Sequence, residues 1–303
     1  MGGPRDKEEF RLFLTNMFND PAIIAAPPFV RKWLAKFIVW RRLDGAWHHY
    51  EAIGGSSPLV GIMESLAEKL AQKVGLPVWI AMRYSPPFAD VAAKELVAQG
   101  VDDLLLLPLY PQYSTTTTES SLRDFIQALS QAGFRGKTKV VKKFYDHRPY
   151  NELIIDLIMQ ALNQDKAREY DLIFSAHGLP QKVIDKGDPY QRHLKFHLWH
   201  LRKILQERGI TFRRTHLAYQ SKVGPMKWLE PSLEEKLRQI RPFTNKVVIF
   251  PIAFTIDNLE TLYELHEQYR EVAQKLGFKE YRVARLPNDS PQAVEALATL
   301  IDF

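Results

Sequence analysis

The chain has 303 residues, of which 46% are hydrophobic and 25% charged, so it can bury a large core as one big domain or two of ordinary size. Its net charge of +6 comes without a sustained Lys/Arg block or an RNA-binding signature, which argues against nucleic acid as a partner. The absence of cysteine excludes disulfides, thiolate zinc sites and cysteine-ligated iron–sulfur clusters. With no signal peptide and no run of about 18 apolar residues, the expected location is cytoplasmic.

The N-terminus begins on a turn sequence. Residues 1–4 contain two glycines and a proline, and a helix-like stretch follows at once over 7–18. In α/β units such a turn joins a strand to a helix, so this start predicts that the first strand of the first sheet is missing from the chain. The loss of a buried strand would leave unpaired backbone groups and an apolar gap in that sheet.

Residues 23–43 combine aromatic and basic side chains. If the segment is helical after Pro28, one face carries an aromatic stripe and the basic residues fall largely on the other. The stripe consists of Phe29, Trp33, Phe37 and Trp40. Such a helix suits a membrane interface or a lip over a flat apolar ligand, and it equally suits a helix packed on the core with its basic ends in water. The sequence leaves both interpretations open.

Strand-like and helix-like runs alternate along the remaining chain. Strands are expected at 77–83, 103–109, 138–144, 171–176, 215–219, 246–254 and 281–286. Helices are expected at 58–74, 88–99, 118–133, 149–163, 190–208, 258–276 and 290–301. This alternation is typical of parallel sheets covered by helices on both faces, in doubly wound α/β units. A weak echo between 106–110 and 249–254 predicts two similar halves that divide near 145–150.

Two loops at helix starts are candidates for anion binding. Residues 110–118 are rich in hydroxyl groups, which suit a ligand carboxylate or phosphate, although Thr116 and Glu119 could equally form a capping box. Residues 54–58 form another turn of this kind, but they lack the lysine of a phosphate-binding P-loop. Nucleotide binding is therefore not expected.

The most informative motif is the apolar run 173–180, which ends in His177, Gly178 and Pro180. It predicts a buried parallel strand that leads into a loop, and ligands bind at the carboxyl ends of such strands. Ser175 and His177 would share one face of the strand. A histidine there can bind metal or transfer protons, while a structural, hydrogen-bonded histidine is the alternative.

A second candidate site lies on the predicted helix after 254. Glu260 and Glu264 are four residues apart and would share one helix face, where two carboxylates could bind a cation or relay protons. The competing interpretation is that Asp257 and Glu260 cap the helix and Glu264 is solvated. His193, His197 and His200 also share a helix face, but no fourth zinc ligand is evident.

Together these segments resemble the ferrochelatase family, whose members complete haem synthesis by inserting iron into a porphyrin. The resemblance extends over almost the whole chain. Four ordered blocks carry it: 172–180 continuing to 186–190, 110–114 with Ser120 and Ser121, 218–225 with Trp228 and Leu229, and 254–261.

The resemblance implies two similar doubly wound lobes around a central porphyrin cleft. The N-terminal lobe would span 1–147, with the helix 290–303 as a candidate addition, and the C-terminal lobe 148–289. The implied reaction takes ferrous iron and a porphyrin as substrates, releases two protons and needs no organic cofactor. Residues 23–43 would form an apolar lip that in this family can contact membrane, so a peripheral membrane position is also expected.

The resemblance also assigns roles to individual residues. His177 would accept pyrrole protons, receive the metal, or both, with Glu260 as its catalytic partner. Glu264 would continue an acidic path, so the implied metal site is His177, Glu260 and Glu264. The positions expected to bind the porphyrin are Arg83, Tyr84, Tyr113, Ser114, Phe29 and Trp33.

Two residues depart from the family pattern. Asn258 stands where a histidine is common, and it can form hydrogen bonds but cannot titrate. Glu119 replaces a usual glycine and adds negative charge near the implied propionate loop. The alternatives to an iron chelatase are therefore a catalytically weak porphyrin- or haem-binding protein and a cobalt chelatase for a related tetrapyrrole. The aromatic lip favours protoporphyrin IX over coproporphyrin.

Overall fold

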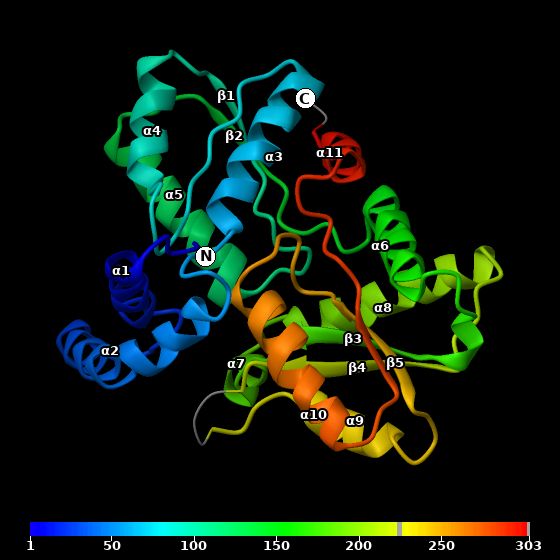
Figure 1. Ribbon diagram of the computed structural model, residues 1–303. Coiled ribbons are helices and arrows are strands. Elements are labelled where there is room, and N and C mark those ends of the chain that lie inside the picture. The colour runs from blue at the N-terminus through cyan, green and yellow to red at the C-terminus, as the bar shows by residue number, and fades with distance from the viewer. Residues whose placement is uncertain (223–225, 302–303) are drawn as a thin grey trace. The chain divides into compact units, whose positions relative to one another are not determined.

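The computed structural model covers residues 1–303 and describes residues 1–222 and 226–301. The described chain divides into two units (Figure 1). Unit 1 contains Met1–Pro108, Tyr113–Lys142 and the chain from Leu300 onward, and unit 2 contains Leu109–Gln112 and Lys143–Thr299. The main crossing from unit 1 to unit 2 falls at Lys143, shortly before the 147/148 boundary expected from the sequence.

Unit 1 is built on a short parallel ladder between two strands. β1 (Asp103–Leu106) pairs in register with β2 (Lys137–Val140). The helices of this unit include α3 (Leu59–Val74), α4 (Ala89–Ala98), the π-helix η1 (Thr115–Glu119) and α5 (Ser120–Gln131). Small and apolar side chains of α4 and α5 pack together in one core cluster, joined by Leu104 from β1. The α/β organisation predicted for this part of the chain is therefore present.

The run 77–83 does not form the strand that its composition predicts. It has no ladder partner among the described residues, and only Met82 bridges to Phe88. Its end is held instead by the Met1 carbonyl, which accepts hydrogen bonds from the backbone of Arg83 and Tyr84. Trp79 and its neighbours line an open cavity of about 400 Å³ with side chains of α3 and α4. High β-propensity alone does not make a strand, because the backbone also needs a pairing partner.

The segment after Pro27 forms the helix that the sequence indicated. α1 (Lys7–Phe18) packs against α2 (Pro28–Glu51), with the rings of Phe10 and Tyr50 4.9 Å apart. The buried residues of α2 are Ala35, Val39, Leu43 and Tyr50, whereas its aromatic stripe is exposed. Its exposed fractions are 76% for Phe29, 65% for Trp33, 44% for Phe37 and 76% for Trp40. These exposed fractions argue against the core-packing interpretation, and the membrane interface and the lip stay predictions.

Unit 2 contains a parallel sheet with the strand order β4-β3-β5-β6. The strands are β3 (Asp171–His177), β4 (Arg214–Gln220), β5 (Lys246–Pro251) and β6 (Glu280–Val283). The helices and turns of the unit are α6 (Arg148–Leu162), η2 (Ala167–Glu169), α7 (Gln181–Asp185), α8 (Tyr190–Glu207), α9 (Leu233–Ile240), the π-helix η3 (Glu260–Gln268), α10 (Tyr269–Lys275) and α11 (Pro291–Ala298).

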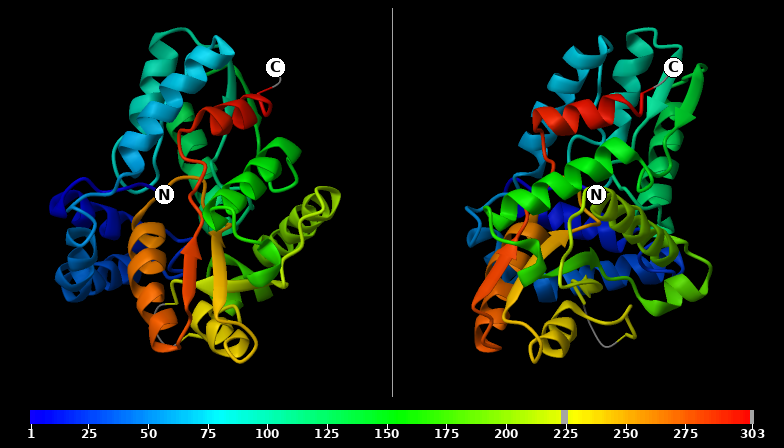
Figure 2. Two further views of the ribbon diagram at one scale, coloured as in Figure 1. Left: turned by 45° about the vertical axis from the view of Figure 1, so that its right-hand side comes forward. Right: turned by 90° about the vertical axis from the view of Figure 1, so that its right-hand side faces the viewer.

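Helices cover this sheet in the manner predicted for a parallel α/β unit (Figure 2). α9 and α10 contact β4 and β6, and they share a core with Ile173 of β3 and Ile249 of β5. α6 contacts β5 and β6 and packs against α8. Because β3 lies between two strands and beneath helices, six of its seven residues are buried.

The last described helix belongs to unit 2. The sequence offered 290–303 as an addition to the N-terminal lobe, but α11 packs on α6, where Ala293 joins Leu153 and Leu157 in a small apolar cluster. His147 also contacts Thr299, with 2.8 Å between its Nε2 and the threonine hydroxyl. Residues 302 and 303 of that stretch, and residues 223–225 of one resemblance block, lie outside the described residues.

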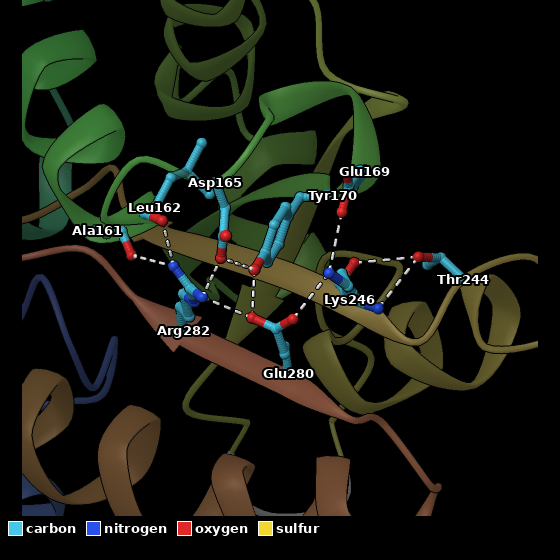
Figure 3. Close-up of polar contacts among 9 residues, drawn as sticks. All are labelled: Ala161, Leu162, Asp165, Glu169, Tyr170, Thr244, Lys246, Glu280 and Arg282. Carbon is cyan, nitrogen blue, oxygen red and sulfur yellow. Dashed lines mark hydrogen bonds and ion pairs between the residues drawn. The ribbon is translucent and has the colours of Figure 1, made fainter.

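Charged side chains join the strand starts of unit 2 (Figure 3). Glu280 of β6 pairs with Arg282 at 2.6 Å and with Lys246 of β5 at 2.9 Å. It also accepts the hydroxyl of Tyr170, the residue before β3, and that hydroxyl lies 2.8 Å from Asp165. The Tyr170 hydrogen bond, Lys246 and Arg282 lower the pKa of Glu280 to about 2. One carboxylate therefore connects three neighbouring strands.

Within the described ranges, no helix is long and apolar enough to cross a membrane.

We predict that Glu280→Gln destabilises the protein by roughly 1–2 kcal/mol near pH 7, since it removes the charge that two cations share. The pKa of Glu280 is lower in the folded protein than its ordinary value of 4.5. This stabilisation is therefore present above about pH 4.5 and disappears as the pH falls toward 2. Urea unfolding at several pH values measures it. Glu271→Gln, at an exposed ion pair on α10, is the control and should change little.

Candidate active site

His177 is held at the carboxyl end of β3 by pairing with β4. β3 is parallel to both β4 and β5, and His177 is the register partner of Gln220, the last residue of β4. The Gly178 amide donates to the Gln220 carbonyl at 2.8 Å, and the Tyr190 hydroxyl donates to the His177 carbonyl at 3.0 Å. The backbone that carries the imidazole is therefore fixed on both sides, as the strand-end prediction required.

The imidazole of His177 meets the carboxylate of Glu260. Its Nδ1 lies 2.8 Å from Glu260 Oε2, and the two side chains are 36% and 31% exposed. Burial opposes the imidazolium, but the Glu260 charge, its hydrogen bond and the charge of Glu264 together raise the pKa of His177. This group can therefore hold a proton near neutral pH and still reach a ligand.

Glu260 begins η3, and the residues before it fix its position. The Asn258 side-chain oxygen accepts the backbone N–H of Glu260 at 2.8 Å, while the Asn258 amide donates to the Ile256 carbonyl. Thr261 donates to the carboxylate of Asp257 at 2.8 Å. The expected capping by Asp257 and Glu260 is therefore wrong: Asp257 accepts a hydroxyl, Asn258 accepts the Glu260 amide, and the Glu260 side chain is directed at His177.

Glu264 lies beside this pair and shares a contact with it. The hydroxyl of Ser221 donates to Glu264 Oε2 at 2.7 Å and lies 3.4 Å from Glu260 Oε2. Gln220 Nε2 lies 3.4 Å from Glu264 Oε2. Burial, followed by the charge of Glu260, raises the pKa of Glu264 to about 7. The solvated-residue interpretation of Glu264 is therefore wrong, because this carboxyl is desolvated beside a second one.

The three groups are close but do not form a ready ligand set. Among the residues that the structure describes, no three His, Asp or Glu side chains are arranged to hold a metal ion. What they share is a hydrogen-bonded acid–base chain from His177 through Glu260 toward Glu264. Such a chain suits proton transfer directly, and metal capture would require the carboxylates to turn toward the cation.

Three residues of this site were missed as site residues by sequence reasoning. Ser221, Gln220 and Tyr190 bond to the carboxylates or to the histidine backbone. A single serine, glutamine or tyrosine carries no spacing pattern, so only the resemblance blocks around 186–190 and 218–225 pointed to these positions. Ser221 also has a φ of +65°, a strained conformation for a residue with a side chain.

In unit 1, Arg83 and Tyr84 are engaged in a buried network. The Tyr84 ring is fully buried, and its hydroxyl donates to Asp20 at 2.8 Å. Arg83 pairs with Asp20 at 3.1 Å and with Asp124 at 3.2 Å, and its Nε donates to Ser120. Burial opposes ionisation of Asp20, but hydrogen bonds from Ser120, the Ala22 amide and Tyr84, with the Arg83 charge, lower its pKa.

The hydroxyl-rich loop of unit 1 caps its own helix. Ser114 is 1% exposed and accepts the Thr116 amide at 3.2 Å. The Tyr113 hydroxyl donates to Glu119 at 2.7 Å, and Glu119 pairs with Arg123 at 2.7 Å. The Tyr113 hydrogen bond and the nearby cations lower the pKa of Glu119. Glu119, which replaces the glycine usual in the family, thus has its charge neutralised by Arg123 and holds the Tyr113 side chain by a hydrogen bond.

One histidine of α8, His197, is enclosed by structural hydrogen bonds. His197 is fully buried between Gln112, 2.7 Å from its Nδ1, and Asn151, 2.8 Å from its Nε2. Burial lowers the pKa of His197 to about 3, so the ring is neutral. Both ring nitrogens are occupied, which removes His197 as a metal ligand. This contact instead binds the segment Leu109–Gln112 into unit 2.

Comparison with known proteins gives consistent matches over the full chain. A family model for ferrochelatase matches residues 1–302. The ferrochelatase of Sulfurimonas denitrificans is 50% identical over 99% of this chain and 95% of its own length. That of Nitratiruptor sp. is 46% identical over 99% of this chain and 96% of its own length. A ferrochelatase of Helicobacter pylori is 43% identical over 100% of this chain and 90% of its own length.

Solved chelatases share the fold at low identity. SirB from Bacillus subtilis, solved with Fe3+, aligns with a TM-score of 0.56 at 12% identity over 79% of this chain and 86% of its own. CbiX, described as the terminal enzyme of sirohaem biosynthesis in denitrifying bacteria, gives a TM-score of 0.54 at 17% identity over 78% of this chain and 88% of its own. The predicted chelatase-like α/β fold is confirmed.

We predict that Glu264→Gln stabilises the protein at pH 8 by roughly 1–3 kcal/mol. The pKa of Glu264 rises from 4.5 to about 7 on folding, so the wild type loses stability as the pH increases through this window. The amide carries no such penalty. Thermal unfolding at pH 4 and pH 8 should show a gain only at the higher pH. Glu267→Gln, an exposed position of the same helix, is the control, and an equal gain there would contradict the burial argument.

Proposed function

The chain belongs to the ferrochelatase family, and we propose that His177, Glu260 and Glu264 are the residues with which it inserts ferrous iron into a porphyrin to form haem. The 2.8 Å contact between His177 Nδ1 and Glu260 carries this assignment. The reaction needs a group that accepts two weakly acidic pyrrole protons, and it needs ligands that replace water on the cation. An imidazole paired with a carboxylate meets both needs.

His177 supplies the base. Its Nδ1 faces Glu260, so a neutral ring donates from Nδ1 to the carboxylate and presents the Nε2 lone pair to a pyrrole N–H or to iron. Glu260 stabilises the imidazolium that forms, because its negative charge lies 2.8 Å away. The proton can then leave through the carboxylate pair. The same contact holds the ring in one orientation while porphyrin and iron enter.

Glu264 supplies the second carboxylate. With a pKa of about 7, it is partly protonated at neutral pH and can exchange its proton for a cation. The Ser221 hydroxyl bridges both carboxylates and holds them side by side without neutralising them. An incoming ferrous ion would relieve the repulsion between the carboxylates, which makes the pair attractive to a divalent cation.

For the porphyrin we propose the residues of unit 1 that the family resemblance names. Phe29 and Trp33 offer exposed aromatic surface to a flat apolar macrocycle. Tyr113 and Ser114 lie at the start of η1, where backbone amides and hydroxyls suit a propionate. Arg83 is partly exposed and adds positive charge to this side, whereas the buried ring of Tyr84 supports it from beneath.

The aromatic lip also guides the choice of substrate and location. Large exposed aromatic side chains favour protoporphyrin IX, which carries fewer carboxylates than coproporphyrin. The basic residues of the same helix, including Arg31 and Lys36, suit anionic lipid headgroups. We therefore propose a peripheral membrane contact through residues 23–43.

We predict that His177→Ala abolishes ferrous insertion while porphyrin still binds, because the base is lost and the binding surface is kept. A loss of about 100-fold or more in kcat is expected for removal of a general base. The measurement is an anaerobic metallation assay, with porphyrin binding followed by fluorescence quenching. His200→Ala, a partly buried histidine of the same unit, should keep wild-type rates.

Two results of this assay would support the other candidate functions. Porphyrin binding by the wild type with metallation no faster than background would make the chain a porphyrin-binding protein, which Asn258 in place of a histidine favours. Faster insertion of cobalt into a related tetrapyrrole would indicate a cobalt chelatase.

We predict that the double variant Trp33→Ala/Trp40→Ala loses about tenfold or more of its binding to vesicles containing phosphatidylserine, because two exposed aromatic side chains no longer enter the interface. Vesicle co-sedimentation at low and high salt measures this. Phe243→Ala removes a similarly exposed aromatic residue of unit 2 and is the control. Equal pelleting of all variants would contradict the membrane contact.

A further inference from the structure

Ser175 shares the strand face of His177 but does not touch the carboxylates of the site. It is fully buried two residues before His177 on β3, and its hydroxyl donates to Gln220 Oε1 at 2.7 Å. Gln220 is 1% exposed and ends β4 beside His177. This pair of buried polar side chains lies directly beneath the acid–base chain.

Both polar atoms of the Gln220 side-chain amide have partners. Its Oε1 accepts from Ser175, while its Nε2 lies 3.4 Å from the Glu260 carbonyl oxygen and 3.4 Å from Glu264 Oε2. If the amide were turned over, Oε1 would face the Glu260 carbonyl oxygen and Glu264 Oε2, and Nε2 could no longer donate to either of them. The Ser175 hydroxyl on one side and these two acceptors on the other therefore favour the same orientation of the amide, with its N–H toward Glu264.

We propose that Ser175 is a positioning residue that locks the Gln220 amide so that its N–H faces Glu264, and that this lock holds the Glu264 carboxylate ready for ferrous iron. The proposal rests on the proposed role of Glu264 in iron uptake. Ser175 acts through Gln220, since its own hydroxyl contacts the amide oxygen and not the acids. Both side chains are buried, so water has little access to replace the hydroxyl.

If Ser175 positions the Gln220 amide, its loss should change KM for ferrous iron and not KM for porphyrin. Ser175→Ala leaves the buried Gln220 oxygen without its donor, so the amide shifts and its 3.4 Å hydrogen bond to Glu264 weakens. We expect KM for ferrous iron to rise about threefold to tenfold, and KM for porphyrin to stay within about twofold. Ser175→Thr keeps a hydroxyl at this position and should restore the wild-type KM for iron.

A double-mutant cycle tests whether the effect passes through Gln220. Gln220→Met replaces the amide with an apolar side chain of similar length, so adding Ser175→Ala to it should leave KM for iron unchanged. Ser57→Ala removes another buried serine hydroxyl, bound to the Leu59 amide in unit 1, and should leave both KM values at wild type. Thermal unfolding of each variant measures any general loss of stability.

The proposal is overturned if Ser175→Ala leaves KM for iron unchanged, if it changes both KM values together, or if its effect persists in the Gln220→Met background. The proposed function would fail differently. A wild type that does not insert iron, or a Glu264→Gln variant with normal iron kinetics, removes the assigned role of Glu264 before Ser175 is tested. A selective rise that disappears in the Gln220→Met background supports the lock.

Discussion

The pairing of β3 with strands on both of its sides is the constraint from which the site of unit 2 follows. β3 pairs with β5 as far as Ser175 and with β4 as far as His177, so its end is held in register by β4. His177 is the last residue of that strand, and its partner Gln220 ends β4. The imidazole therefore extends from the end of a paired strand, whereas its acidic partner Glu260 lies on η3.

The site concentrates negative charge where water is scarce. Glu260 and Glu264 are close, and burial of Glu264 makes its ionised form unfavourable. The protein offsets this with neutral donors from Ser221 and Gln220 and with the imidazole of His177. A lysine or arginine in the same place would form a stable ion pair, but it would also repel a divalent cation. Neutral donors leave the negative charge of the two acids available to the ferrous ion that we propose they bind.

Much of unit 2 could be predicted from its sequence, because its signals are local. The run ending in His177 has the composition of a buried parallel strand, and β3, β4 and β5 fall where expected. The polar lock between Ser175 and Gln220 could not be predicted, since the two residues are 45 positions apart and neither type has a diagnostic spacing. Strand register brings them together, and register is a property of the whole sheet.

Less of unit 1 could be predicted from its sequence. Residues 77–83 have the composition of a strand but no ladder partner in the described chain, so no strand forms there. Composition alone could not show that the partner was absent. The aromatic stripe of α2 was ambiguous for a different reason. A periodic pattern reveals which side chains share a face, but it does not reveal what covers that face.

Ser221 has a further consequence that concerns the backbone. Its φ of +65° is a conformation that glycine would adopt more easily, yet glycine would lose the hydroxyl that bridges Glu260 and Glu264. Conformational strain of order 1–3 kcal/mol is therefore retained at Ser221, whose hydroxyl is the donor to Glu264. Folding alone would favour a different residue here. The positive φ of Ser221 therefore identifies, from the backbone alone, a residue of the proposed site whose conformation lowers the stability of the fold.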